Sequence, residues 1–272
     1  MEPLRGRTAV VVGASSGVGQ AVARRLAEEG VTVFAAARRE GRLAELAAVA
    51  TAAGRIVPVA TDVRDPTAVA ALFDRAEAAT PPFDLVVNAA GVVHYGDFAT
   101  QPADDWDEMV GINLVGALHV LQAGLQRLLP RGGGRIVQVT SVTATLAIPG
   151  VSVYGATKAG LSRLLAGLRG EYAEQGVRIA ELELGATRDT EAGRGRSGPL
   201  SGEQGRGLGT SGGERRPIES SPEVLDRLLR WSGGGRTLRL DDVVDAVLFL
   251  LQAGAGARVD HLRLREPSDI PT

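Results

Sequence analysis

Thr8-Ala-Val-Val-Val-Gly-Ala-Ser-Ser-Gly-Val-Gly19 is the stretch that decides the fold. A short apolar run leads directly into three closely spaced glycines, and residues with helical periodicity follow them. Glycines suit a tight turn, where a Cβ would obstruct the approach of a pyrophosphate. The N–H groups at the start of the following helix attract phosphate. The stretch therefore predicts a strand, a nucleotide-binding turn and a helix. The residues of the predicted turn are Gly13, Ser15, Ser16, Gly17, Val18 and Gly19.

Short apolar runs alternate with longer amphipathic segments along the rest of the chain. The predicted strands are 8–12, 31–36, 56–60, 85–87, 135–140, 177–183 and 259–264. The predicted helices are 17–29, 42–53, 67–79, 104–129, 153–175 and 241–252. Parallel strands covered by helices on both faces read as continuous apolar runs, so we expect an α/β fold. Its architecture would be a doubly wound parallel sheet of the Rossmann type.

Length, composition and charge limit the classes of function. The 272 residues, 44% of them hydrophobic, predict one domain over 1–272. A net charge of −2 argues against nucleic acid as a partner, and a small-molecule substrate fits better. With no cysteine and three scattered histidines, we expect no metal site. Met1–Arg7 lacks the apolar stretch of a signal peptide, and no run approaches the roughly 18 apolar residues of a membrane helix. We therefore expect a cytoplasmic protein without a membrane partner.

One segment interrupts the alternation. Residues 185–217 are rich in Gly, Ser, Arg and Glu, and they cannot bury enough surface to offset the entropy of ordering them. Because ligands bind at the carboxyl edge of such sheets, we predict a mobile substrate flap over 185–232, with a helix at 222–230. The alternative is an unstructured insertion.

The end of the second predicted strand indicates which nucleotide binds. It reads Ala-Ala-Arg38-Arg39, with no carboxylate before Glu40. An acidic residue there would bind the ribose hydroxyls of NAD, whereas arginine matches the 2′-phosphate of NADP. NADP(H) is therefore preferred over NAD(H). The alternative is that both arginines are ordinary surface residues.

Two further strand ends complete the expected cofactor site. Asp62 and Val63 follow the third predicted strand, where Asp62 could bind the adenine amino group or cap a turn before Pro66. Asn88, Ala89, Ala90 and Gly91 end the fourth, where small residues would let a cofactor lie against backbone. The Asn88 amide is expected to tie neighbouring strands together.

Four polar residues predict the chemistry. Tyr154 and Lys158 are one helical turn apart, so a cation would lie beside a phenol whose ordinary pKa is about 10. Ser141 ends the fifth predicted strand and could donate a second hydrogen bond to a carbonyl oxygen. Asn113 lies inside a long predicted helix, which its amide could bend while holding water. Each residue alone could belong to a half-buried face, but together they favour hydride transfer to a carbonyl.

These motifs resemble the short-chain dehydrogenase/reductase family over nearly the whole chain. The family's catalytic tetrad falls on Asn113, Ser141, Tyr154 and Lys158, and its Asn-Ala-Gly motif on Asn88 to Gly91. The resemblance implies strand order 3-2-1-4-5-6-7 and NAD(P)-dependent carbonyl or alcohol chemistry. It also implies a homotetramer or homodimer built on helices 104–129 and 153–175. Gly185, Ala186 and Thr187 would meet the nicotinamide carboxamide. The chain departs from the family pattern at Val12, usually Thr, and at Leu184, usually Pro.

Substrate contacts are expected from two loops. The candidate residues are His94, Tyr95, Val142, Thr143 and Ile148. The second loop is mostly apolar, which favours a medium-sized, largely apolar ketone. The leading hypothesis is NADPH-dependent ketone reduction, or the reverse oxidation of a secondary alcohol, with Tyr154 as general acid and base. The alternatives are a redox-neutral epimerase or dehydratase with a keto intermediate, and a non-catalytic nucleotide-sensing protein.

Overall fold

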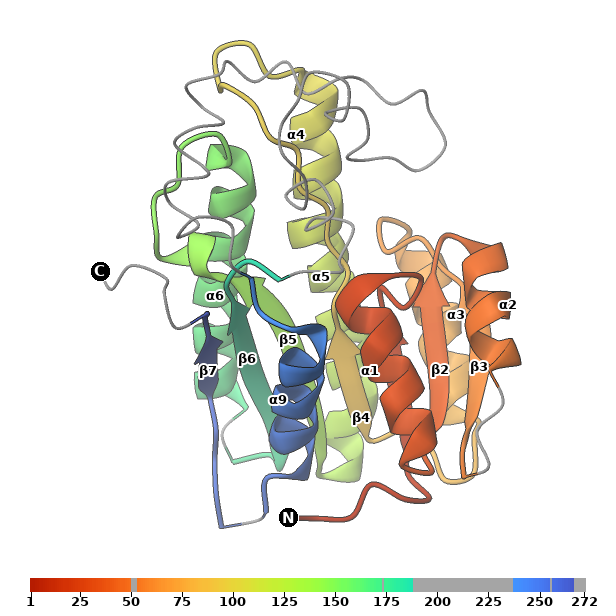
Figure 1. Ribbon diagram of the computed structural model, residues 1–272. Coiled ribbons are helices and arrows are strands. Elements are labelled where there is room, and N and C mark those ends of the chain that lie inside the picture. Colours follow the sequence, from red (N-terminus) through yellow and green to blue (C-terminus); the bar gives the residue numbers. More distant parts are fainter. Residues whose placement is uncertain (50–52, 173, 188–236, 255, 267–272) are drawn as a thin grey trace.

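A computed structural model of the chain describes residues 1–49, 53–172, 174–187, 237–254 and 256–266. These residues build one parallel sheet with strand order β3-β2-β1-β4-β5-β6-β7 (Figure 1). The strands are β1 Thr8–Val12, β2 Thr32–Ala37, β3 Arg55–Ala60, β4 Leu85–Asn88, β5 Gly134–Ser141, β6 Val177–Leu184 and β7 His261–Leu264. The predicted fold class and strand order are confirmed. The order reverses between β1 and β4, which is where ligands bind in doubly wound sheets.

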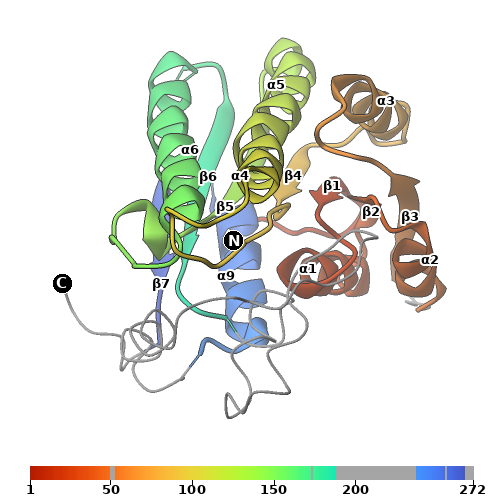
Figure 2. The ribbon, with the colours of Figure 1, turned by 90° about the horizontal axis from the view of Figure 1, so that it is seen from above.

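Helices cover both faces of the sheet. They are α1 Gly17–Glu28, α2 Glu40–Ala48, α3 Pro66–Glu77, α4 Ala103–Val110, α5 Ala117–Leu128, α6 Ser152–Glu171 and α9 Leu240–Gln252. Figure 2 shows α1, α2 and α9 on one face, and α3, α5 and α6 on the other. Each face has its own core cluster, because successive strand residues point to opposite faces. In β1, Val11 belongs to one cluster and Val10 to the other.

The predicted helix 104–129 exists but is not uniform. A π-helical segment, η1 Gly111–Gly116, joins α4 to α5, and Asn113 lies inside it. Among the described residues, only the helical stretch Ala103–Arg131 is long and apolar enough to cross a membrane, and 56% of its most apolar 18 residues are buried. Such burial is ordinary for a core helix of a soluble protein.

Several predicted boundaries need correction. The helix predicted over 67–79 is α3 Pro66–Glu77, and the helix predicted from residue 42 begins at Glu40. Helix α2 ends at Ala48 rather than at residue 53, because Val49 already has extended backbone angles. The last strand begins at His261 rather than at residue 259. Helix α6 ends at Glu171 rather than at residue 175. The predicted helix 222–230 and nearly all of the predicted flap lie outside the described residues.

Candidate active site

The glycine turn after β1 packs directly against the loop after β4. Gly13 has a φ of 83°, and a Cβ there would lie 2.7 Å from the carbonyl carbon of Ala89 and from the nitrogen of Ala90. A Cβ on Gly19 would in turn collide with the backbone of Gly13. Larger residues at these two positions would separate the loops, so the structure brings both predicted cofactor motifs together.

The two arginines after β2 have different partners. Arg39 donates from Nε and Nη2 to Ser15 Oγ, at 3.1 and 2.8 Å, and from Nη2 to Ser16 Oγ at 2.9 Å. Arg38 instead pairs with Glu108 on α4, with 3.6 Å between Nη1 and Oε1. Arg39 therefore lies over the glycine turn, whereas Arg38 is turned towards α4.

Ser16 is the N-cap residue of α1, yet its hydroxyl accepts from Arg39. In the described structure, the Ser16 side chain makes no capping hydrogen bond to a backbone N–H of α1. The first N–H groups of the helix therefore remain suited to binding an anion. A pyrophosphate between the turn and α1 fits this arrangement.

Asp62 is held at the edge of the site. Both of its carboxylate oxygens accept from the Arg64 side chain, Oδ1 from Nε at 3.1 Å and Oδ2 from Nη2 at 2.6 Å. The Arg64 side chain, together with its backbone N–H, holds the pKa of Asp62 below its usual range. The bond from the backbone nitrogen of Arg64 to Oδ1 makes Asp62 a turn-forming residue. Val63 is buried, and its carbonyl oxygen lies 2.9 Å from His119 Nδ1.

Asn88 and Asn113 are both fully buried. The Asn88 amide donates to Gln138 Oε1 at 2.9 Å and so ties β4 to β5. Asn113 accepts from the Val92 nitrogen and donates to the Val92 oxygen, both at 2.8 Å, and also donates to Thr157 Oγ1 at 3.3 Å. The predicted bend is thus a π-helical turn that directs the amide towards the loop after β4 and towards α6.

Lys158 is the single lysine of the chain, and it is buried beneath Tyr154. Its Nζ lies 5.6 Å from the centre of the Tyr154 ring and 3.5 Å from the carbonyl oxygen of Val139. Burial lowers its pKa to about 8, because a charged amine is poorly solvated there. A Cβ on Gly91 would lie 3.3 Å from Asn113 Oδ1 and 3.4 Å from Lys158 Nζ.

Ser141 ends β5 and is buried. Its Oγ accepts from the Thr143 nitrogen at 3.3 Å, as the N-cap of the short 3-10 helix Val142–Ala144. An accepting hydroxyl keeps its own proton for donation. Ser141, Lys158 and Asn113 therefore come from three different elements, and all lie at the carboxyl edge of the sheet.

The predicted substrate residues divide into two groups. Ile148 and Val151 form a small apolar cluster with Tyr154 and Tyr95 packed against it. Val142 is buried, and the carbonyl of Thr143 lies against α6 at Gly155.

The ring of His94 is instead engaged with α4, where Nε2 lies 2.8 Å from Glu108 Oε2. Glu108 thus bridges His94 and Arg38. This link was not apparent from the sequence, because 70 positions separate Arg38 from Glu108.

The end of β6 is held near this edge. The Gly185 nitrogen donates to the Leu264 oxygen at 2.9 Å, and the hydroxyl of Thr187 donates to the Gly185 oxygen at 3.1 Å. The carbonyl of Ala186 accepts from Leu238. Of the predicted flap, these three are the only residues described.

The profile of the family described as short chain dehydrogenase matches residues 7–198. The chain belongs to this family. It is therefore an oxidoreductase of the short chain dehydrogenase type, and the sheet order and site geometry agree with this membership.

Three relatives show how far the similarity extends. Oxidoreductase UcpA of Escherichia coli K12 is 36% identical over 190 residues, which cover 69% of this chain and 72% of UcpA. An uncharacterized oxidoreductase of Staphylococcus epidermidis is 29% identical over 97% of this chain and 99% of its own length. Glycine betaine reductase ATRR of Emericella nidulans is 38% identical over 68% of this chain, but the matched part spans only 15% of that protein.

Two solved structures share the fold over almost their whole length. A gluconate 5-dehydrogenase from Burkholderia cenocepacia, in complex with NADP and tartrate, is 26% identical with a TM-score of 0.79. It covers 97% of this chain and 96% of its own. An alcohol dehydrogenase from Thermococcus sibiricus, complexed with 5-hydroxy-NADP, is 26% identical with a TM-score of 0.76 and covers 98% and 99%.

Proposed function

We propose that this short chain dehydrogenase is an NADPH-dependent ketoreductase that can also oxidise the corresponding secondary alcohol. The observation that carries the proposal is the meeting of Tyr154, Lys158 and Asn113 beside Gly91, under a small apolar cluster. A phenol beside a buried amine is an arrangement suited to passing one proton to a carbonyl oxygen.

The chain has residues suited to each part of a bound dinucleotide. The glycine turn and the start of α1 would hold the pyrophosphate, Asn88–Gly91 would lie along the cofactor, and Ala186 and Thr187 would meet the carboxamide. When bound, the cofactor supplies the hydride for the carbonyl carbon.

The protein side chains handle the charge and the proton. The hydroxyls of Ser141 and Tyr154 donate hydrogen bonds to the carbonyl oxygen, where negative charge develops. Tyr154 then gives its proton to that oxygen, and the ammonium of Lys158 stabilises the phenolate left behind. Asn113 keeps the loop at Val92 and the helix at Thr157 in fixed positions around Lys158.

NADP(H) is proposed as the preferred cofactor over NAD(H). Arg39 lies on the two serines of the glycine turn, and β2 ends without a carboxylate among its described residues. A guanidinium fork aligned in this way matches a phosphate. The gluconate 5-dehydrogenase and the alcohol dehydrogenase described above were both solved with NADP or a derivative of it.

The proposed substrate is a medium-sized, largely apolar ketone. Ile148 and Val151 form a small apolar cluster, and Tyr154 packs against it together with Val93, Tyr95 and Leu146. An apolar ring or chain would gain from leaving water at such a surface. We also propose that the enzyme works in the cytoplasm, which agrees with the partial burial of the one described helix that is long and apolar enough to cross a membrane.

Replacing Tyr154 with Phe tests the proposed function. We expect NADPH oxidation with a panel of aryl and alkyl ketones to fall by roughly a hundredfold or more, because general acid catalysis is lost. The NADPH dissociation constant, measured by fluorescence titration, should change little. Tyr172→Phe, which changes a ring at the far end of α6, serves as the matched control. Full turnover by Tyr154→Phe would contradict the proposal.

A further inference from the structure

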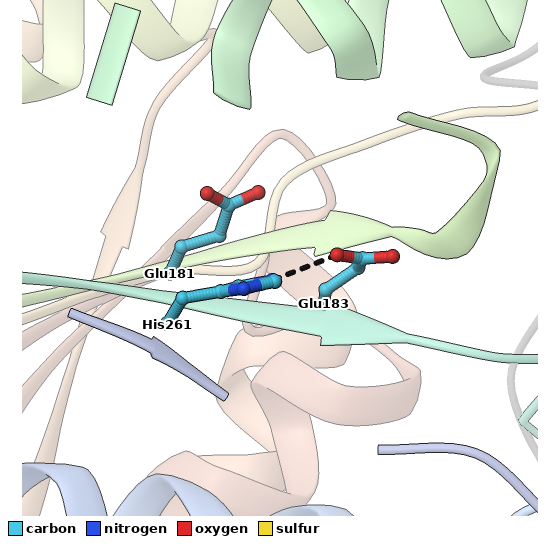
Figure 3. A group of neighbouring side chains, drawn as sticks. All are labelled: Glu181, Glu183 and His261. Atoms are coloured by element: carbon cyan, nitrogen blue, oxygen red, sulfur yellow. Dashed lines mark hydrogen bonds and ion pairs between the residues drawn. The ribbon is translucent and has the colours of Figure 1, made fainter. Parts of the chain in front are cut away.

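Two carboxylates on β6 and one histidine on β7 form a cluster that the proposed chemistry does not use. The ligand-type atoms of Glu181, Glu183 and His261 all lie within 4.8 Å of one another. Figure 3 shows these three side chains. A metal site does not follow, because protein groups already use the carboxylates. Arg263 contacts both oxygens of Glu183, at 2.9 and 3.1 Å, and His261 Nε2 lies 2.7 Å from Oε2.

Glu181 has different partners and is the more informative residue. Only 2% of it is exposed, on a strand face whose neighbours Val177 and Ile179 pack in an apolar cluster. Burying a carboxylate costs several kcal/mol unless charges and hydrogen bonds compensate it. Arg169 supplies a cation 3.9 Å from Oε2. An apolar residue could occupy this position without the desolvation cost of a carboxylate. The hydrogen bonds of Glu181 therefore indicate what the carboxylate does.

Each oxygen of Glu181 is bonded to a different catalytic element. Oε1 accepts from the Thr140 hydroxyl at 2.8 Å, and Thr140 directly precedes Ser141 on β5. Oε2 accepts from the Ser162 hydroxyl at 3.1 Å. Ser162 comes four residues after Lys158, and Lys158 four after Tyr154, so the three share one face of α6. One rigid carboxylate thus joins the strand of Ser141 to the helix of Tyr154 and Lys158.

We propose that Glu181 is a positioning residue of the active site, which sets the separation between Ser141 on β5 and Tyr154 on α6. This inference rests on the proposed function, because it concerns the same pair of hydroxyls. Both must reach one carbonyl oxygen, and a misplacement of about 1 Å can lower a rate by about a hundredfold.

The test removes each link separately while keeping the carboxylate. Thr140→Val and Ser162→Ala should each lower kcat for the best ketone of the panel about tenfold, and leave the NADPH dissociation constant unchanged. The double variant should lower kcat by less than the product of the two single effects, because each substitution alone already breaks the connection between β5 and α6 through Glu181. Ser162→Thr restores a hydroxyl and should recover most of kcat. His261→Gln removes only a contact of Glu183 and is the matched control.

A second measurement does not depend on the substrate. Because Lys158 is the single lysine, ¹⁵N-lysine labelling gives one side-chain resonance to titrate. Loosening α6 admits water to the amine, so its pKa should rise from about 8 towards the ordinary lysine value in Thr140→Val and Ser162→Ala. Unchanged kcat and an unchanged titration in both folded variants would overturn the proposal. A wild type that reduces no ketone would instead refute the proposed function, and the titration alone would then decide the role of Glu181.

Discussion

Among 30 basic side chains, 29 are arginine, and the one lysine lies under Tyr154. Arginine stays charged at any accessible pH and presents a wide, planar fork, whereas a lysine amine is compact and shifts its pKa when buried. The chain thus uses arginine for its surface and for anions such as the one expected at Arg39. Its single lysine stands at the position where a small cation fits beneath a phenol.

The burial of Lys158 predicts a pH dependence of stability. Its pKa is lowered in the folded state, from 10.5 to about 8, so between these pH values the unfolded chain binds more protons. Stability relative to Lys158→Met should therefore rise with pH across this window, by on the order of 3 kcal/mol at about 1.4 kcal/mol per pH unit. Urea unfolding of both proteins from pH 7 to 10.5 measures the difference. A constant difference would mean that the amine is solvated in the folded protein.

Arg38 and Arg39 lead to separate predictions for cofactor affinity. Arg39→Ala should raise the NADPH dissociation constant about ten- to a hundredfold with little effect on NADH, because a charge-assisted hydrogen bond to phosphate contributes about 1.5–3 kcal/mol. Arg38→Ala should have a smaller effect, since Arg38 must first leave Glu108. Fluorescence titration with both cofactors gives the two ratios. Equal losses for NADPH and NADH in Arg39→Ala would contradict the assignment of Arg39 to the phosphate.

At the scale of elements, the pattern of apolar residues predicts where the strands lie, but it does not explain the charged residues inside them. β1 is buried at every position, so its pattern was unmistakable. In β6, however, Glu181 and Glu183 interrupt the face that Val177 and Ile179 begin, and the hydroxyl and arginine groups that donate hydrogen bonds to them lie 19 or more positions away. Such a pairing depends on tertiary contacts that no local periodicity carries.

The effect of Asn113 on its helix is easier to predict from the sequence. An amide inside an apolar helix must find partners, so a local distortion was predictable, but its form as a π-helical turn depends on Val92 and Thr157. The four-residue spacing of Tyr154 and Lys158 predicts that the two side chains meet, as they do, whereas the different partners of Arg38 and Arg39 depend on the fold. Residues 188–232 of the predicted flap lie outside the described residues, and the flap stays a prediction.

At the scale of the whole molecule, the helical stretch formed by α4, η1 and α5 exposes three large apolar side chains to water. Val110, Val115 and Leu118 are each 39% exposed, within nine residues of one another. We propose that a second copy of the chain covers these side chains, in a homodimer or within a homotetramer. The segment that would be buried also contains Asn113, so association would restrain the helix that holds the catalytic edge.

Charge at these positions should therefore separate the subunits. Val115→Arg combined with Leu118→Arg would place two like charges in the buried interface, where they cannot pair with each other and where unpaired charge is strongly unfavourable. Light scattering after gel filtration should then give the 28.2 kDa of one chain, where the wild type gives a multiple of it. Val49→Arg changes an apolar residue that is 48% exposed at the end of α2 and should leave the mass unchanged. A wild type of 28.2 kDa would refute the proposed interface, and its exposed valines and leucine would then need another partner.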